Sequence, residues 1–207
     1  MTEQKITRAY DFEMRTEKNE EHGDHVVGMP IVFGSRTNLG FFDEMIDSHA
    51  LDNTDLKDVR FLVNHDTSKI PLARSRNNNA NSTMQMEITE AGMNIRVDLD
   101  TENNSDARNL YSAIKRGDIS GMSFAFLVDG ETWTDLESDH PTRTITSISR
   151  VLEVSAVTFP AYEATSISAR SEDEKALESA RSALESVKRA EKLEKLRNKL
   201  KEVKDAD

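Results

Sequence analysis

In the stretch GDISGMSFAF, residues 117–126, Ser123 follows two glycines, at 117 and 121, and precedes a run of large apolar side chains. The continuation SFAFLV has the pattern of a strand buried on both faces. Glycines at 117 and 121 permit a tight turn before that strand. Ser123 therefore stands at the start of a core strand, where its hydroxyl can be aimed at a site or can bond a neighbouring carbonyl. From these residues alone, the carbonyl bond is the simpler interpretation.

Strand patterns extend over most of the first 170 residues. In MNIRVDL, residues 93–99, apolar side chains alternate with polar ones, which predicts a strand with one buried face. RVLEVSAVTF, residues 150–159, has the pattern of a strand buried on both faces. Further strands are expected within residues 6–14, 25–33, 59–65 and 83–88. These patterns predict an α+β protein that is mainly β.

Two short helices are expected among these strands. In residues 105–116 apolar side chains recur at spacings of three and four, and Gly117 can end the helix. A second helical stretch is expected at residues 41–46. SRNNNANST, residues 75–83, contains few side chains that pack and predicts a loop.

The composition changes sharply near Ser171, because all four prolines, all eight glycines and every aromatic residue precede it. The remaining residues are mainly Ala, Leu, Glu, Lys, Arg and Ser, which favour a helix with a narrow apolar stripe. Such a helix can pair with another helix, dock on the domain or remain a solvated extension. We therefore predict a domain over residues 1–170 and a charged helical tail over residues 171–207, a candidate scaffold or targeting segment.

Charge and cysteine content exclude several classes of function. The chain has 27 Lys and Arg against 38 Asp and Glu, a net charge of −11, which argues against binding to nucleic acid or anionic membranes. With no cysteine there is no disulfide, thiol nucleophile or thiolate metal site. No run approaches the length of a membrane span, and the first residues lack the apolar core of a signal peptide. We expect a soluble cytosolic protein with protein partners and no cofactor or metal.

Two further residues have side chains that can take part in catalysis. His65 ends the apolar run VRFLV, where an imidazole can act as a general base or as a structural hydrogen-bonding group. Glu153 lies inside an apolar strand, and a buried carboxylate there requires a partner. It can orient a histidine, form an ion pair with Arg150 or another arginine, or face water at a sheet edge. The other histidines, His22, His25, His49 and His140, are interpreted as surface groups, with a position of His49 or His140 near the site as the alternative.

Taken in order, the segments from about Gly28 to Tyr162 resemble the prohead, or capsid maturation, serine proteases of tailed bacteriophages, which are related to herpesvirus assemblin. The matching pieces are GMPIVFG, FFDEMI, VRFLVNHD, EAGMNIRVDLD, RNLYSAIKRGDISGMSFAF and RVLEVSAVTFPAY. Two segments depart from the family pattern: DSHALDN lacks a glycine before its alanine, and PLARS lacks one after its leucine.

The resemblance implies a catalytic set of His65 as general base, Ser123 as nucleophile and a third residue that orients the histidine. Herpesvirus relatives use a second histidine in that third position, and here Glu153 occupies the corresponding strand. The implied fold is a closed, mostly antiparallel β-barrel ringed by a few helices, followed by the helical tail.

The resemblance also implies a place of action and a set of partners. Such a protease is made in the host cytoplasm and packaged inside the immature capsid. There it digests the scaffold and the scaffolding segments of the major capsid protein, contacts shell or portal subunits, and trims itself, with residues 165–174 as the expected cut zone. Self-association is a further expectation. Two alternatives stay open: a catalytically silent scaffold or assembly protein with the same barrel, and a non-enzymatic β-barrel binding module.

Overall fold

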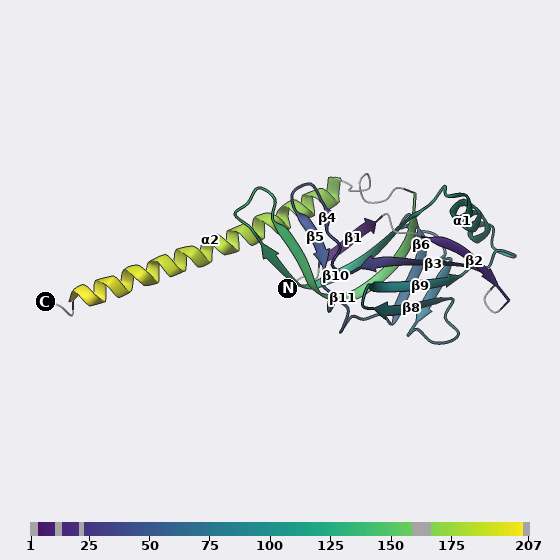
Figure 1. The fold of residues 1–207 in the computed structure, drawn as a ribbon, viewed down its shortest axis with the longest axis horizontal. Helices are drawn as coiled ribbons and strands as arrows, with labels where there is room; N and C mark the ends of the chain where they lie inside the picture. The colour runs from purple at the N-terminus through teal and green to yellow at the C-terminus, as the bar shows by residue number, and fades with distance from the viewer. Residues whose placement is uncertain (1–3, 11–13, 21–22, 159–166, 205–207) are drawn as a thin grey trace.

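The computed structural model describes residues 4–10, 14–20, 23–158 and 167–204, and within them the chain is mostly β with two helices (Figure 1). Eleven strands form a seven-stranded and a four-stranded sheet. The larger sheet contains β1 (Gln4–Tyr10), β4 (Thr37–Asn38), β5 (Asp43–Ile46), β6 (Asp58–Val63), β7 (Ala73–Arg76), β10 (Gly121–Thr134) and β11 (Thr142–Val157). The smaller contains β2 (Arg15–Asn19), β3 (Gly23–Val32), β8 (Met84–Thr89) and β9 (Gly92–Asp98).

The long strand β11 organises the larger sheet. Along one edge it pairs antiparallel with β10. Along the other edge it pairs in parallel with two short strands in succession, β5 at residues 142–145 and β6 at residues 153–156. β1 then pairs antiparallel with the free edge of β10, so the run SFAFLV lies between two strands. This buried position agrees with its apolar pattern.

The expected closed barrel is wrong over the residues that the structure describes. The larger sheet runs in the order β1-β10-β11-β5-β4, with β6 and β7 attached to β11 as a branch, and the smaller sheet runs β2-β3-β9-β8. Both sheets are open. The apolar patterns along each strand predicted pairing and burial, but closure depends on contacts between distant strands that those patterns do not encode. The two sheets share one continuous core, to which Val26, Met93 and Phe124 contribute.

Helix α1 (Ser105–Arg116) confirms the sequence prediction at both ends. Asn104 caps its first turn by accepting hydrogen bonds from the backbone N–H groups of residues 106 and 107. Gly117 ends it with a φ of 79°, a left-handed conformation that costs glycine little. The second predicted helix is wrong, because residues 43–46 form strand β5. Their parallel pairing with β11 outweighs the weak helical spacing of so short a segment.

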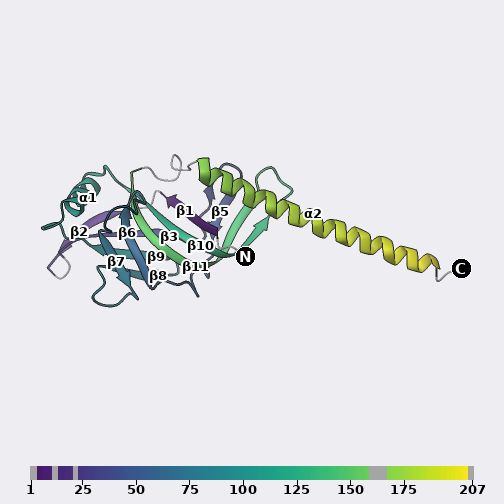
Figure 2. The same ribbon diagram turned by 180° about the vertical axis from the view of Figure 1, so that it is seen from behind.

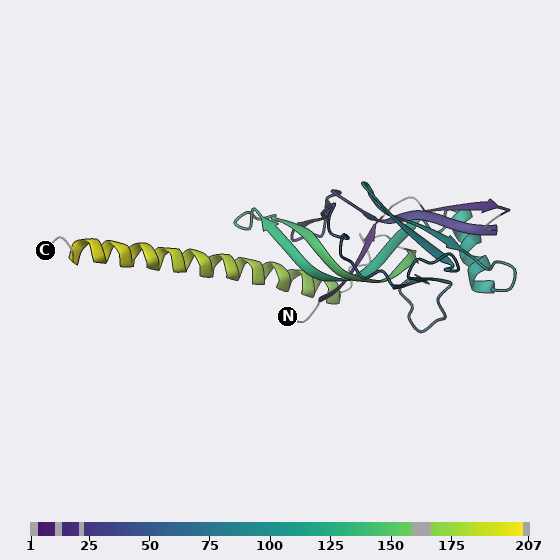
Figure 3. The same cartoon turned by 90° about the horizontal axis from the view of Figure 1, so that it is seen from below.

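Helix α2 (Ile167–Lys204) begins against the body and then projects far beyond it (Figures 1 and 2). Near its start, Asp173 and Leu177 are buried. Arg181 donates hydrogen bonds to the carbonyls of Leu136 and Ser138 in the β10–β11 turn. Farther along, Leu193 and Leu196 are exposed, and Figure 3 shows this part of the helix apart from both sheets. None of the helices that the structure describes is long and apolar enough to cross a membrane.

Candidate active site

Glu153 is buried in β11 and has two hydrogen-bonding partners. Its Oε1 lies 2.5 Å from His65 Nδ1, and its Oε2 accepts a hydrogen bond from Ser155 Oγ at 2.6 Å. Because a carboxylate can only accept, Nδ1 is the donor in the first contact. The predicted need of this buried acid for a partner is therefore met by an imidazole. Arg150, the alternative considered from sequence, pairs instead with Asp55 at 3.2 Å.

A tight turn after β6 carries His65 over β11. Asn64 and His65 both adopt positive φ, 49° and 59°, which reverses the chain. Backbone N–H groups of the turn donate hydrogen bonds to β11, from Asn64 to the carbonyl of Ala156 and from His65 to Ser155 Oγ. The ring is 32 % exposed, and no group among the described residues bonds its Nε2. With Nδ1 donating to Glu153, a neutral ring carries its lone pair on Nε2, as a general base requires.

Ser123 lies on the neighbouring strand, and its hydroxyl bonds a group outside this pair. In the β10–β11 ladder Ser123 is directly opposite Ser155, so both side chains project from the same face of the sheet. Ser123 is fully buried, and its Oγ donates a hydrogen bond of 2.8 Å to the carbonyl oxygen of Arg8 on β1. The structure thus brings His65 and Glu153 into contact, while the Ser123 hydroxyl makes a carbonyl bond, the simpler of the two sequence-based interpretations.

Ser155 is a site residue that the sequence did not single out. Its hydroxyl donates to Glu153 and accepts from the His65 backbone N–H, so it links the carboxylate to the turn that carries the ring. The available signal was spacing: a polar residue two positions after Glu153 shares its face of the strand. In a strand with apolar side chains on both faces, a second polar residue on the face of Glu153 was the signal that pointed to Ser155.

Behind Ser123, β1 is anchored by a buried ion cluster. The cluster consists of Arg8, Glu44, Arg143 and Asp173, which are all at least 96 % buried. Arg8 bonds Glu44 through Nε and Nη2 and reaches Asp173 on α2 at 2.8 Å, while Arg143 Nη1 lies 3.2 Å from Glu44. Burial raises the pKa of Glu44, but the charges of Arg8 and Arg143 outweigh it and hold that pKa below its ordinary value. Arg8, whose carbonyl accepts the hydrogen bond from Ser123, is therefore linked to α2 through Asp173.

The remaining histidines are placed as follows. His25 is buried, with Nδ1 against the Gly23 carbonyl and Nε2 3.4 Å from Glu17, so its interpretation as a surface group is wrong. The strand β3 that contains it is paired on both edges, which its charged sequence neighbours did not indicate. His49 is exposed beside Asp52, and His140 is about one-third exposed beside Asp43. His22 lies outside the described residues.

Within the part of the chain that the structure describes, no His, Asp or Glu cluster is arranged to hold a metal ion.

Comparison with known proteins supports an assignment to a family. Residues 11–179 match the caudovirus prohead serine protease family. Among solved structures, the chain is similar to the bacteriophage T4 capsid assembly protease gp21, with 12 % identity and a TM-score of 0.44, covering 75 % of this chain and 98 % of that one. No curated protein sequence gives a significant match. Because the family match spans most of the chain, the protein belongs to the caudovirus prohead serine proteases.

Proposed function

We propose that this capsid maturation protease cleaves scaffold and the scaffolding segments of the major capsid protein with His65, Ser123 and Glu153 as its catalytic residues. The observation that carries the proposal is the His65–Glu153 hydrogen bond beside a serine on the adjacent strand. Serine hydrolases use a buried carboxylate that orients an imidazole, whose other nitrogen accepts the proton of a nearby hydroxyl.

The proposed reaction passes through an acyl-enzyme. Ser123 Oγ attacks the peptide carbonyl carbon while its proton passes to His65 Nε2, and the carbonyl electron pair moves onto the oxygen. When the tetrahedral intermediate collapses, the C–N bond breaks and His65 returns the proton to the leaving amine. Water then attacks the ester by the same steps and frees Ser123. Throughout, Glu153 holds the ring through Nδ1 and stabilises the imidazolium.

For the first step, the Ser123 hydroxyl must exchange its partner. At present it donates to Arg8 O on the β1 side, whereas His65 is carried over β11 on the other side. Staggered side-chain rotamers differ by about 120°, so one rotation about χ1 changes the direction of Oγ without moving the strand. Catalytic hydrogen bonds often form only once substrate is bound. We therefore expect the hydroxyl to turn toward Nε2 in the substrate complex.

Cleavage of the cognate capsid and scaffold proteins tests the proposal. The chain is co-expressed with both proteins, and their lengths are followed by mass spectrometry. We expect both to be shortened by the parent chain and to stay at full length with Ser123→Ala or His65→Ala. Ser75→Ala is the matched control, because Ser75 is also fully buried and its hydroxyl has no partner among the described residues. Shortening by the Ser123→Ala variant would refute the assignment.

Self-cleavage is the second part of the proposal, with the tail as the segment removed. Part of the expected cut zone, residues 167–174, belongs to α2, and Asp173 is buried there. A protease needs an extended substrate, so cleavage within those residues requires the start of α2 to unfold. Prolonged incubation of the purified parent chain beside Ser123→Ala, followed by intact-mass measurement, checks this. Equal full-length masses would count against self-processing.

A catalytically silent assembly protein is the second candidate function. It is favoured by the projecting part of α2, whose exposed Leu193 and Leu196 are available to an assembly partner, and by the bond that Ser123 makes to a backbone carbonyl. In that case the Ser123→Ala variant would support shell assembly as well as the parent does, and no capsid or scaffold chain would be shortened by either.

A further inference from the structure

The turn that carries His65 has an unfavourable backbone. It consists of residues 63–66, and the Asp66 N–H closes it with a hydrogen bond of 3.1 Å to the Val63 carbonyl. Its two central residues, Asn64 and His65, have φ of 49° and 59°. Residues other than glycine adopt this left-handed conformation mostly singly, and it persists where surrounding contacts hold it. The placement of the imidazole therefore depends on what fixes the turn.

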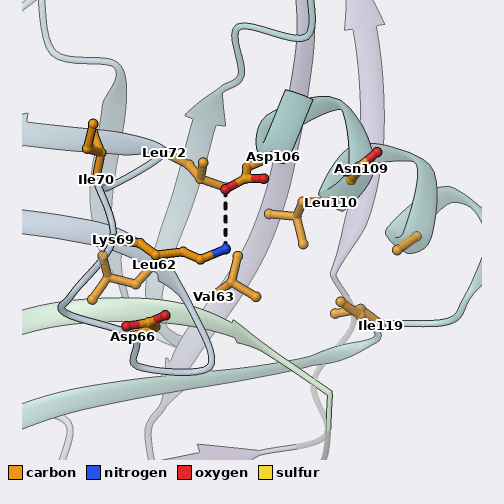
Figure 4. A pocket seen from close by; sticks show the side chains of 11 residues that line it. Leu62, Val63, Asp66, Lys69, Ile70, Leu72, Asp106, Asn109, Leu110 and Ile119 are labelled. Carbon is orange, nitrogen blue, oxygen red and sulfur yellow. Dashed lines mark hydrogen bonds and ion pairs between the residues drawn. The ribbon is translucent and has the colours of Figure 1, made fainter. Parts of the chain in front are cut away.

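The chain after the turn gives it little support. A pocket of about 280 Å³ separates these residues from helix α1, and Figure 4 shows Lys69 and Asp106 on opposite sides of it. Lys69 Nζ lies 3.4 Å from the Asp106 carboxylate, but both side chains are more than half exposed, and such ion pairs contribute little to stability. Ile70, the next residue, is 86 % exposed. The turn therefore depends on its contacts with β11.

The Asn64 side chain bonds Thr158, the residue that follows β11. Its Oδ1 accepts a hydrogen bond of 3.0 Å from the Thr158 backbone N–H. Thr158 Oγ1 lies within hydrogen-bond distance of both Asn64 Nδ2, at 3.1 Å, and Asn64 Oδ1, at 3.3 Å. We call these bonds the Asn64–Thr158 contact. The contact extends the attachment of the turn beyond the last ladder pair of β6 and β11, Val63 with Ala156.

The Asn64–Thr158 contact gives the turn a second, separate point of attachment. The first is at Ser155, whose hydroxyl accepts from the His65 N–H. A strand rises about 3.3 Å per residue, so Ser155 and Thr158 are about 10 Å apart along the chain. Without the contact, the remaining attachments, at Ser155 and Ala156, are adjacent, and the turn can pivot about them. With it, the ring keeps the direction that places Nδ1 2.5 Å from Glu153.

We propose that Asn64 is a positioning residue for His65 and acts through its contact with Thr158. The inference rests on the proposed protease function and adds to it a residue that touches neither the substrate nor the reacting atoms. Loss of the contact should lower kcat and leave KM unchanged, because substrate contacts remain while the base is misdirected.

Two substitutions remove the contact in different ways. Asn64→Gly removes all of its side-chain bonds and keeps the turn backbone favourable, because glycine adopts positive φ without strain. Thr158→Val removes the hydroxyl but keeps the size of the side chain and the backbone N–H. Asn77→Gly is the matched control, because Asn77 is also an exposed asparagine with positive φ, 53°, in the turn after β7. None of these residues is in the proposed catalytic set.

Steady-state kinetics on a cleaved capsid peptide give the first measurement. We expect Asn64→Gly to lower kcat about 10-fold, less than the roughly 10²-fold cost of a 1 Å misplacement, because the ring keeps its bond to Glu153. Thr158→Val should lower kcat only about 3-fold, since the Thr158 N–H bond remains. In the double variant the loss should stay near 10-fold, because both substitutions break the same contact. Asn77→Gly should leave kcat unchanged.

Proton NMR of the His65 ring gives the second measurement. The Nδ1 proton, in its short hydrogen bond to Glu153, should give a downfield signal that His65→Ala lacks. Asn64→Gly should shift this signal upfield or broaden it, and Asn77→Gly should not. Both variants should melt at the temperature of the parent chain, which separates a change of ring position from a loss of stability.

The outcomes separate this inference from the function on which it rests. If Asn64→Gly cleaves with the kcat of the parent chain, or if Asn77→Gly lowers kcat as much, the role of Asn64 is wrong and the protease assignment stands. If the parent chain makes no cuts in the cognate capsid protein that Ser123→Ala abolishes, both are overturned. Should Asn64→Gly fail to fold, Thr158→Val decides alone, and an unchanged kcat and Nδ1 signal there would overturn the inference.

Discussion

Removing the charge of Glu44 at the centre of the buried ion cluster should destabilise the protein strongly. Glu44 is fully buried and accepts hydrogen bonds from both Arg8 and Arg143. The substitution Glu44→Gln keeps the shape of the side chain but leaves two buried guanidinium groups without their shared carboxylate. An unpaired buried charge typically costs about 3–5 kcal/mol.

The lower end of that range applies here, because each arginine keeps one other acidic partner. Arg8 still reaches Asp173, and Arg143 still bonds Glu131. We therefore expect a loss of about 3 kcal/mol in the free energy of unfolding. For a chain of this size, that corresponds to a decrease in melting temperature of about 6–12 °C.

The pH dependence of the difference in stability between the parent chain and Glu44→Gln shows whether the Glu44 charge is its cause. The pKa of Glu44 is lowered in the folded protein from its ordinary value of 4.5. A carboxyl group of this kind stabilises the fold fully above its unfolded-state pKa, and the contribution is lost as the pH falls through the lowered pKa. The stability gap between parent and Glu44→Gln should therefore be constant near neutral pH and should shrink only below about pH 4.5.

Thermal denaturation followed by circular dichroism at pH 7 and at several acid values measures both effects. Glu87→Gln, at an exposed position of strand β8, is the control and should change the melting temperature little. A loss below 1 kcal/mol for Glu44→Gln at pH 7, or a gap that is the same at pH 3 as at pH 7, would refute the reasoning.

Three further predictions follow from the site and from α1. Glu153→Gln should lower kcat about 10²–10⁴-fold with little change in KM, because the amide cannot stabilise the imidazolium that forms on His65. Both constants are measured on a cleaved capsid peptide, and an unchanged kcat would contradict this role. Ser155→Ala should lower kcat by up to about 10²-fold, because the turn that carries His65 loses a hydrogen bond to β11. The control Ser75→Ala should leave kcat unchanged. Equal effects of the two substitutions would mean that the loss of any buried hydroxyl lowers kcat, whatever its contacts. Gly117→Ala should cost about 1 kcal/mol in denaturant unfolding, because its φ of 79° lies in the left-handed region, which disfavours alanine. A neutral result would show that alanine adopts this conformation without strain.

The sequence was sufficient where the signal is local. Apolar spacing and Gly117 predicted both ends of α1, and alternation in residues 93–99 predicted a strand that the structure contains as β9. The sequence predicted that Glu153 has a hydrogen-bonding or ionic partner, because a carboxylate buried in an apolar strand is costly without one. Its identification with His65 came from the family resemblance, and the structure places the two in contact.

Features that depend on contacts between distant segments were not predictable. Arg8, Glu44 and Asp173 lie far apart in the chain, and nothing in their local sequence marks them as one buried cluster. The partner of the Ser123 hydroxyl comes from β1, which is separated from it by more than one hundred residues. The openness of the sheets has the same origin, since strand order is set by long-range pairing and not by the pattern within a strand.

Covalent labelling of Ser123 by a fluorophosphonate tests the central claim most directly. The reagent forms a stable adduct with a serine whose hydroxyl can pass its proton to a base. We predict a single adduct, mapped to Ser123 by peptide mass spectrometry, that is absent from His65→Ala and strongly reduced in Glu153→Gln. An unlabelled Ser123 in a preparation that still shortens its capsid protein, or equal labelling in His65→Ala, would contradict the account.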